Sequence, residues 1–468
     1  MGRRIAVIGS GQAGLVAAHG LVRGGHEVTV YSDRTPEQSL LEARPTGTAA
    51  RFAAALGYER ELDLAHWEAA APKMRGAHVS FSPKVGNRLI TLAGRMSTFC
   101  QAIDLRLQSH RWLTDLGDRV VVGKVDPDKL DDIARSHELV LVATGRGPLA
   151  ELFPRNAERS VYTEPQRKLA MVITTGGALH IDGVPFLPGK FNLFGDAGEA
   201  FWIPYHHRDH GPSWCLLFEA KRGGRMDRFD GCRSGADVVA TAKAVIADLM
   251  PWDADWVKPH ELADPNGWLT GSVTPTVREP VARLPSGAVA MPLGDTAISL
   301  DPIAGQGANL GNKLARHIVE AVASRDPALP FDAAWMTATF EAFWIDHGAA
   351  TVAFTNVLLE PMTAAGKLMF ISQYGSDGTG DSPRQRIANA VVENFVDPRR
   401  YTHAFTDAAK ARALLAELTG GRRRRTFAAS MTRIAGKQLG RVFGRTPRHP
   451  LAPAPAPAAT ISAPSAFD

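Results

Sequence analysis

The stretch RRIAVIGSGQAG, residues 3–14, joins a short apolar run to a Gly-x-Gly-x-x-Gly pattern. The apolar run predicts a buried strand, and residues 13–23, which place small side chains on one side, predict the helix that follows. Residues 26–32 (HEVTVYS) predict a second strand, because β-branched side chains alternate along it. A strand, a glycine-rich turn, a helix and a second strand in this order begin a dinucleotide-binding unit.

The glycine-rich turn predicts a site for a pyrophosphate. Its glycines permit a tight turn, a close approach of the ligand to the backbone, and close packing of the helix on the strand. An acidic residue normally follows about 20 residues later and binds the ribose hydroxyls. Here a serine, Ser32, stands where flavoproteins usually carry a glutamate, and Asp33 follows it. The expected cofactor contacts are Gly9, Gly11, Gln12, Ala13, Gly14, Ser32, Asp33 and Arg34.

Two later segments predict strands of the same sheet, ELVLVATG (138–145) and AVAMPLGD (288–295). The second is followed by a proline and then by GQGAN (305–309), which opens a helix. A helix N-terminus with bare N–H groups binds negative charge, so this loop predicts an anion site that needs no charged side chain. The expected contacts from these segments are Thr144, Gly145, Gly294, Asp295, Pro302, Gly305, Gln306, Gly307, Ala308 and Asn309.

The composition excludes several classes of protein. A hydrophobic fraction of 45% and a charged fraction of 22% are ordinary for a globular protein, and no apolar run approaches the roughly 18 residues of a membrane span. The three cysteines have no CxxC spacing, which argues against a disulfide framework or a structural zinc and favours a reducing, cytoplasmic setting.

The net charge of +5 comes from the C-terminal tail. Residues 419–467 hold nine of the 53 basic residues and no acid. The rest of the chain has 44 basic residues against 47 of the 48 acidic ones, once Asp468 is also set aside. We therefore expect no nucleic-acid binding by the folded part.

The ordered set of GxGxxG, ATG and GD followed by PxxGxGxN resembles the FAD-binding fold of the p-hydroxybenzoate hydroxylase superfamily. In that fold the GD aspartate bonds the ribityl chain and the last helix points its positive end at the flavin pyrimidine edge. The resemblance implies that the anion expected at residues 305–309 is reduced flavin.

Further motifs narrow the resemblance to the styrene/indole monooxygenase family, and they cover the chain from its N-terminus to about residue 418. The matching stretches are VTVYSDR (28–34), Arg44 with Thr46-Gly47-Thr48, Asp104-Leu105-Arg106, EPQRKL (164–169), DPIAGQGAN (301–309) and ENFVDPRRY (393–401). These proteins are the oxygenase components of two-component FAD epoxidases. The resemblance implies that FAD arrives as FADH2 from a separate NADH-dependent flavin reductase. With O2 it forms a C4a-hydroperoxide, which epoxidises an aromatic vinyl or indole-type double bond.

The resemblance also implies roles for individual residues. Arg44 and Arg106 join the expected cofactor contacts, and the flavin-side pocket is expected at Thr46, Gly47, Thr48 and Pro302. The expected substrate contacts are Trp202, Pro204, Tyr205, Trp214, Ile303 and Ala304. The family's asparagine beside the flavin is replaced near Thr46-Gly47, and the aromatic stretch expected at 70–80 contains MRGAHVS. Styrene, indole and a larger alkene or arene therefore all stay open as substrates.

The expected fold class is α/β, with a Rossmann-like FAD-binding domain, an inserted antiparallel β-sheet and a helical C-terminal region. Residues 165–225 hold β-rich runs separated by Gly/Pro turns, and 78–92 predict a hairpin that joins them. The expected division is 1–75, 98–164 and 285–330 for FAD, 76–97 and 165–284 for substrate, 331–420 for the helical region, and 421–468 for a basic segment and a Pro/Ala tail.

For three further segments we favour a structural interpretation over a functional one. His206–His210 has no helical i,i+4 frame, so a solvated turn is favoured over a metal site, and no metal is expected. Gly195-Asp196 also follows a strand but no PxxGQGAN comes after it, so we interpret it as a turn. Residues 427–442 predict a basic amphipathic helix; a solvated helix is favoured over contact with a membrane. A homodimer is compatible with the sequence.

Two other functions stay open. A single-component aromatic hydroxylase of the same superfamily would hold FAD permanently and use NAD(P)H directly. Ser32 and the GQGAN motif favour the two-component enzyme. A flavin-fold binding protein without turnover would show degenerate glycines or a lost GD, and both motifs are intact.

Overall fold

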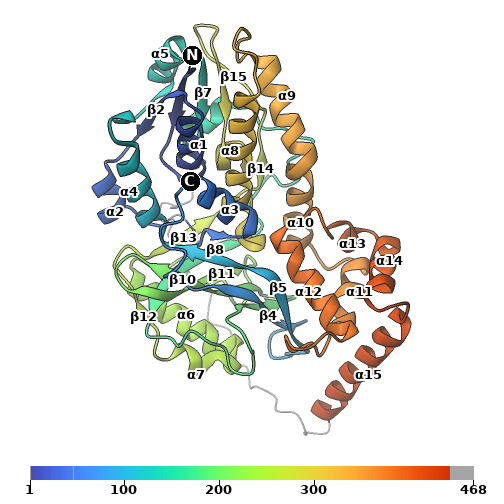
Figure 1. Ribbon diagram of the computed structural model, residues 1–468. Coiled ribbons are helices and arrows are strands. Elements are labelled where there is room, and N and C mark those ends of the chain that lie inside the picture. Colours follow the sequence, from blue (N-terminus) through green and yellow to red (C-terminus); the bar gives the residue numbers. More distant parts are fainter. Residues whose placement is uncertain (1, 46, 443–468) are drawn as a thin grey trace.

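The computed structural model describes residues 2–45 and 47–442, and Figure 1 shows three parts stacked around two sheets. A parallel sheet with helices on its faces lies at the top, a larger sheet lies across the middle, and the later helices pack along one side. The predicted alternation of strands and helices in the first part, and the β-rich insertion, are both present.

The upper sheet, sheet A, contains six strands within the described residues. Their order is β15 (Ala282–Arg283), β16 (Val289–Pro292), β7 (Leu139–Val142), β1 (Arg4–Ile8), β2 (Glu27–Ser32) and β6 (Val120–Val122). β1 pairs in parallel with β2 and with β7, and β16 pairs in parallel with β7. The carboxyl ends of β1, β7 and β16 therefore meet at one edge, as the sequence predicted.

The middle sheet, sheet B, contains nine strands in the described part of the chain. They are β3 (Ala50–Arg51), β4 (Met74–Ser82), β5 (Ile90–Ile103), β8 (Lys168–Thr175), β9 (Gly189–Phe194), β10 (Gly198–His207), β11 (Gly211–Ala220), β12 (Glu261–Leu262) and β13 (Trp268–Ser272). The predicted hairpin at 78–92 is confirmed, because β4 and β5 pair antiparallel across it. A short ladder of β14 (Thr276–Val277) and β17 (Ile298–Ser299) lies apart from both sheets.

The helices cover sheet A, the lower face of sheet B and the C-terminal side. Those of the first two parts are α1 (Gln12–Arg23), α2 (Pro36–Leu41), α3 (Ala53–Glu61), α4 (Leu105–Leu116), α5 (Pro127–Ser136), α6 (Gly235–Leu249), α7 (Ala254–Val257) and α8 (Gly307–Ala323). Those that follow are α9 (Ala333–Phe343), α10 (Ala349–Leu359), α11 (Ala364–Ser372), α12 (Pro383–Val396), α13 (His403–Thr406), α14 (Ala408–Leu418) and α15 (Arg423–Val442). A π-helical segment, Trp344–Gly348, joins α9 to α10.

Short 3-10 turns complete the chain, and two of them matter for the site. Gly294–Thr296 follows β16, and Pro302–Ala304 precedes α8. The others are Gly117–Arg119, Pro148–Leu152 and Pro251–Asp253.

Sheet B separates two apolar clusters, because successive side chains on a strand point to opposite faces. On β10, Phe201, Ile203 and Tyr205 belong to a cluster that also holds Ile303 and Ala304, whereas Trp202 belongs to the cluster on the other face. We call the first cluster the upper cluster; it lies between sheet B and residues of α10 and α12. The lower cluster packs against α6 and α7.

The predicted basic helix is present as α15, which packs on α11 and extends away from the body in Figure 1. Ile434 is its contact with the core, beside Ile90 and Leu92 of β5. None of the described helices is long and apolar enough to cross a membrane. The Pro/Ala tail that the sequence places after Thr446 lies outside the described residues.

Candidate functional site

The loops after β1, β7 and β16 form the candidate site at the carboxyl edge of sheet A. Gly9 has φ +108°, and a Cβ built there would lie 2.5 Å from the carbonyl oxygen of Ala143. A Cβ on Gly14 would lie 2.5 Å from the carbonyl oxygen of Gly9. These two glycines are therefore required for close packing of the turn. Gly145 and Gly305 instead have open space in front of them, which leaves room for a ligand against the backbone.

Two helices start at this edge without a side-chain cap. The N-caps are Gly11 for α1 and Gln306 for α8, and neither side chain accepts a backbone N–H. The helices α6, α9 and α12, away from the edge, are capped by Ser234, Asp332 and Ser382. The first-turn N–H groups of α1 and α8 thus keep their hydrogen-bonding capacity and their positive field for an anion.

Asp295 lies beside the start of α8. Its Oδ1 is 3.7 Å from the position of a Cβ on Gly307. Burial raises the pKa of Asp295, and the positive charge of Arg146 opposes that rise. Next to it, the hydroxyl of Thr296 donates to the carbonyl of Gly145 over 2.9 Å, which ties the β16 loop to the β7 loop. The structure therefore brings the GD and ATG segments together.

Ser32 is fully buried and its hydroxyl is already engaged. It donates to the carbonyl oxygen of Arg34 and lies 2.8 Å from the hydroxyl of Ser10. Asp33 and Arg34 are exposed and form a loose ion pair of 3.8 Å with each other. The carboxylate that usually holds a ribose is therefore replaced by a hydroxyl with other partners.

The GQGAN segment contacts its surroundings through two side-chain amides. Gln306 donates from Nε2 to the carbonyl oxygens of Ala304 and Phe395. Asn309 accepts from the backbone N–H of Phe52 over 2.8 Å and donates to the carbonyl of Ala50. These amides hold the loop in place, which leaves the backbone of Gly305, Gly307 and Ala308 to meet a ligand.

The residues fit a flavin cofactor by three observations. The uncapped starts of α1 and α8 suit a diphosphate and an anionic ring edge, and the open glycines admit a planar group. The buried hydroxyl of Thr144 has no hydrogen-bond partner among the described residues. A buried polar group without a partner is unfavourable, so this hydroxyl fits a bound ligand.

Several predicted residues have no contact with this edge that the structure defines. Gly47 and Thr48 are half-buried, and Gly47 has open space in front of it. The guanidinium of Arg44 stacks 4.5 Å over the ring of Trp268. Pro302 is half-buried at the start of its turn. Thr46 lies outside the described residues.

The surroundings of Arg106 contradict the prediction that it contacts the cofactor. It is buried with its guanidinium bonded to Asp104 and to Asp264, at 2.7 and 2.8 Å. His207 lies 2.6 Å from the same Asp264 carboxylate. These hydrogen bonds and the Arg106 charge hold the pKa of Asp264 well below its usual range, against the effect of burial. Arg106 therefore ties α4 to sheet B, and its donors are used before any cofactor binds.

The predicted substrate residues divide between the two faces of sheet B. Tyr205, Ile303 and Ala304 share the upper cluster, on the side of the candidate site. Trp202 and Trp214 are buried in the lower cluster, where both pack on Trp256 of α7. Pro204 lies two residues from Trp202 and so on the same face. The prediction of substrate contact is therefore wrong for Trp202, Pro204 and Trp214, because strand alternation points them away.

The second Gly-Asp pair lies in a turn, as the sequence predicted, whereas the histidine run does so only in part, because His206 and His207 belong to β10. Residues 208–210 connect β10 to β11, although His207 before them is buried rather than solvated. Asp196 lies between β9 and β10 and accepts the N–H of Val85 over 3.1 Å. Within the described residues, no group of three or more His, Cys, Asp or Glu side chains is placed to hold a metal.

The comparisons with known proteins agree with the geometry. Residues 145–255 match the family model described as "Styrene monooxygenase A putative substrate binding domain". The chain is 27% identical over 324 residues to styrene monooxygenase StyA of Pseudomonas fluorescens, covering 67% of this chain and 76% of that protein. The StyA of a Pseudomonas species is also 27% identical, over 322 residues. These matches support a relationship to the styrene monooxygenase family of flavin monooxygenases.

Solved structures of other flavin-dependent enzymes have the same fold. The flavin-dependent brominase Bmp2 covers 89% of this chain with a TM-score of 0.58 and 16% identity, and 99% of its own length aligns. The oxygenase of 2-methyl-3-hydroxypyridine-5-carboxylic acid covers 83% with a TM-score of 0.53 and 13% identity, and 96% of its own length aligns. The chain thus has the fold of these enzymes. Its similarity to the StyA relatives supports a FAD-dependent monooxygenase.

Sequence reasoning missed a buried ion pair that joins the two helix starts of this styrene monooxygenase relative. Glu59 of α3 and Arg51 of β3 are both buried, with Nε 2.7 Å from Oε1. The same Oε1 accepts from Gln12 of α1 and Asn312 of α8. Glu59 lies in an ordinary-looking amphipathic segment, so the sequence alone gave no signal for this role.

Proposed function

We propose that the protein is the oxygenase component of a two-component system, with FAD as the flavin. FAD is delivered reduced by a separate NADH-dependent flavin reductase, and the reaction inserts one oxygen of O2 into an aromatic vinyl or indole-type double bond. The StyA relatives are styrene monooxygenases, which supports this substrate class. The three cysteines are free and buried, which accords with the cytoplasmic setting proposed from the sequence.

We call the candidate flavin site at the carboxyl edge of sheet A the flavin cradle. The observation that carries the proposal is the position of the start of α8 between this cradle and the upper cluster. Its uncapped N-terminus follows directly on Pro302–Ala304, and Ile303 and Ala304 of that turn are buried in the upper cluster with Tyr205. One short segment therefore presents a positive helix end to a flavin ring and an apolar wall to a substrate. Reduced flavin supplies the activated oxygen in such a site.

The chain's own residues bind, orient and exclude water. The backbone around Gly305 and Gly307 would meet the ring, and the field of α8 would stabilise negative charge at its edge. Asp295, whose Oδ1 lies beside Gly307, would hold the chain of the cofactor near the helix start. The upper cluster would exclude competing water around Ile303, because its side chains are apolar and buried.

The state of Ser32 favours the two-component enzyme over a single-component hydroxylase. A carboxylate at this position would accept charge-assisted hydrogen bonds, each worth about 1.5–3 kcal/mol. The Ser32 hydroxyl is uncharged and already bonded to Ser10 and Arg34. A weak hold on the adenosine ribose suits a cofactor that arrives and leaves in each cycle.

The test is oxygen-dependent turnover of styrene and of indole by the purified chain with FAD, NADH and any FAD reductase. We expect styrene oxide or indigo only when the reductase is present, and no NADH oxidation by the chain alone. A variant with Ile303→Arg, which places a charge in the upper cluster, should lose product while it retains flavin binding. A chain that is isolated yellow with stoichiometric FAD and oxidises NADH unaided would support the single-component alternative.

A further inference from the structure

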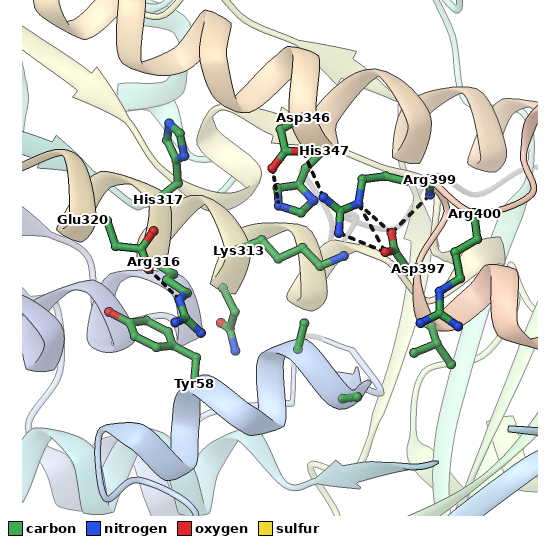
Figure 2. A pocket seen from close by; sticks show the side chains of 14 residues that line it. Tyr58, Lys313, Arg316, His317, Glu320, Asp346, His347, Asp397, Arg399 and Arg400 are labelled. Atoms are coloured by element: carbon green, nitrogen blue, oxygen red, sulfur yellow. Dashed lines mark hydrogen bonds and ion pairs between the residues drawn. The ribbon is translucent and has the colours of Figure 1, made fainter. Parts of the chain in front are cut away.

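A cavity of about 360 Å³ lies against the side of α8, between α3, the π-helical segment and the loop that follows α12. Figure 2 shows its lining, in which basic side chains converge from three elements. The charged and aromatic lining residues include Tyr58, Lys313, Arg316, His347, Asp397 and Arg399. The loop after α12 holds the later residues of the ENFVDPRRY motif, whose Phe395 carbonyl accepts from Gln306 of the GQGAN segment.

The cavity is separate from the flavin cradle, although both use α8. Gly311 packs on α1, where a Cβ built on it would lie 3.2 Å from Ala13. Lys313 follows two residues later, about 200° further around the helix, and so faces away from α1. It also lies about 9 Å along the helix axis from Gly307. A ligand in the cavity would therefore bind outside the cofactor site.

Most charges in the cavity are already paired. Arg399 bonds to Asp397 and, over 2.9 Å, to Asp346. Arg316 bonds to Glu320 and Glu61. Both guanidinium groups already have acidic partners, so none of these six residues is the feature that requires a ligand.

Lys313 is the exception. Its ammonium group extends into the middle of the cavity in Figure 2, and no carboxylate lies within 4 Å of it among the described residues. Burial lowers its pKa, against the opposing effect of Asp397. The Nδ1 atom of His347, which also lines the cavity, is buried without a hydrogen-bond partner in the described structure.

Lys313 is half-buried. Withdrawing an ammonium from water is unfavourable without a counter-ion and is tolerated where the charge is paired. We propose that the cavity binds a small molecule with an oxyanion group, a carboxylate or a phosphate, on the ammonium of Lys313. The apolar side chains of Ala53, Ala54 and Val396 line the same cavity and would contact the remainder of the molecule. The site does not depend on the proposed oxidation chemistry.

The test is isothermal titration of the full chain with inorganic phosphate and, separately, with benzoate, at constant ionic strength in chloride. We expect at least one of the two to bind, and the preferred one identifies the class of oxyanion. Lys313→Met, which keeps the length of the side chain and removes its charge, should weaken binding by at least about tenfold. Lys313→Arg should restore most of it. Lys367→Met, at an exposed lysine of α11, is the matched control and should leave binding unchanged.

A second measurement needs no variant. Reductive methylation of the wild-type chain, followed by peptide mass spectrometry, should show Lys313 protected by the oxyanion and Lys367 modified equally with and without it. FAD affinity should stay within about threefold in Lys313→Met, because the cofactor site is separate. The proposal is overturned if neither anion binds up to about 20 mM, or if Lys313→Met binds as tightly as wild type.

Discussion

The carboxyl groups of Glu219 and Asp301 are both fully buried, and the charge of Asp301 acts on Glu219. Glu219 projects from β11 and Asp301 caps the turn that leads into α8. Burial raises the pKa of Glu219 well above its ordinary value, and the neighbouring Asp301 raises it further. These two effects favour the protonated form of Glu219, beneath the loop that carries Pro302.

This pair predicts a pH dependence of stability. Because the pKa of Glu219 is raised on folding, the native chain holds a proton that the unfolded chain releases above about pH 4.3. Its contribution to stability is present below that pH and is lost as the pH rises toward the folded pKa. We expect the melting temperature of Glu219→Gln to fall less steeply than that of wild type between pH 5 and 9. Expressed as unfolding free energy, the slopes of the two proteins with pH should differ by up to about 1.4 kcal/mol per pH unit. Equal slopes for wild type and Glu219→Gln would show that Glu219 holds no extra proton in the native state.

Asp295 and Asp196 provide a matched pair, since each follows a glycine after a strand. Asp295→Ala should reduce flavin affinity by more than about tenfold, because it removes the carboxylate beside the start of α8. Asp196→Ala should leave it within about threefold, because Asp196 bonds only the turn at Val85. Titration of FAD by fluorescence quenching measures both. Equal losses would contradict the assignment of the two positions.

The redox state of the flavin should change its affinity. Reduced FAD carries extra negative charge at the edge that faces the uncapped N-terminus of α8, a difference of about 1–2 kcal/mol in a favourable site. We therefore expect reduced FAD to bind roughly 5- to 30-fold more tightly than oxidised FAD. Anaerobic titrations of both forms measure the ratio directly. A shift of the bound flavin's potential to more positive values must accompany it by thermodynamic linkage.

Removal of the Asn309 side chain should lower the free energy of unfolding, apart from any effect on catalysis. Asn309→Ala would leave the buried N–H of Phe52 and carbonyl of Ala50 without partners, which costs about 1–3 kcal/mol for each group. We expect a loss of about 2–4 kcal/mol in unfolding free energy by urea titration, with weaker flavin binding. Asn356→Ala is the control, because the amide oxygen of Asn356 has no partner in the described residues.

A substitution at Arg106 tests its structural role in tying α4 to sheet B. Arg106→Met would leave Asp104 and Asp264 buried without their counter-ion, and breaking such a pair costs about 3–5 kcal/mol. The loss should appear in urea unfolding, while the folded fraction should bind FAD within about threefold of wild type. A loss of flavin affinity without a loss of stability would restore the cofactor role that the sequence suggested.

The sequence predicted the cofactor edge well because its elements are local. The turn at Gly9–Gly14 and the helix start at Gly307 each follow from a few adjacent residues, and their glycines have few other uses. The failures at Trp202 and Arg106 have a different cause. Which face of a strand points to the site depends on the register of distant partners, and an arginine's role depends on carboxylates such as Asp264, 158 residues away in the chain. Neither can be inferred from a short motif.

The bond from Asn309 to Ala50 spans 259 residues of sequence, and this has a consequence during protein synthesis. A ribosome adds about 5–20 residues per second, so residue 309 appears roughly 15–60 s after the first strand. Until then the nascent chain can form the turn at Gly9 but not the opposite side of the cradle. The cofactor consequently cannot assist the folding of the first half, and the unpaired edge of β1 is exposed to chaperones until β7 arrives.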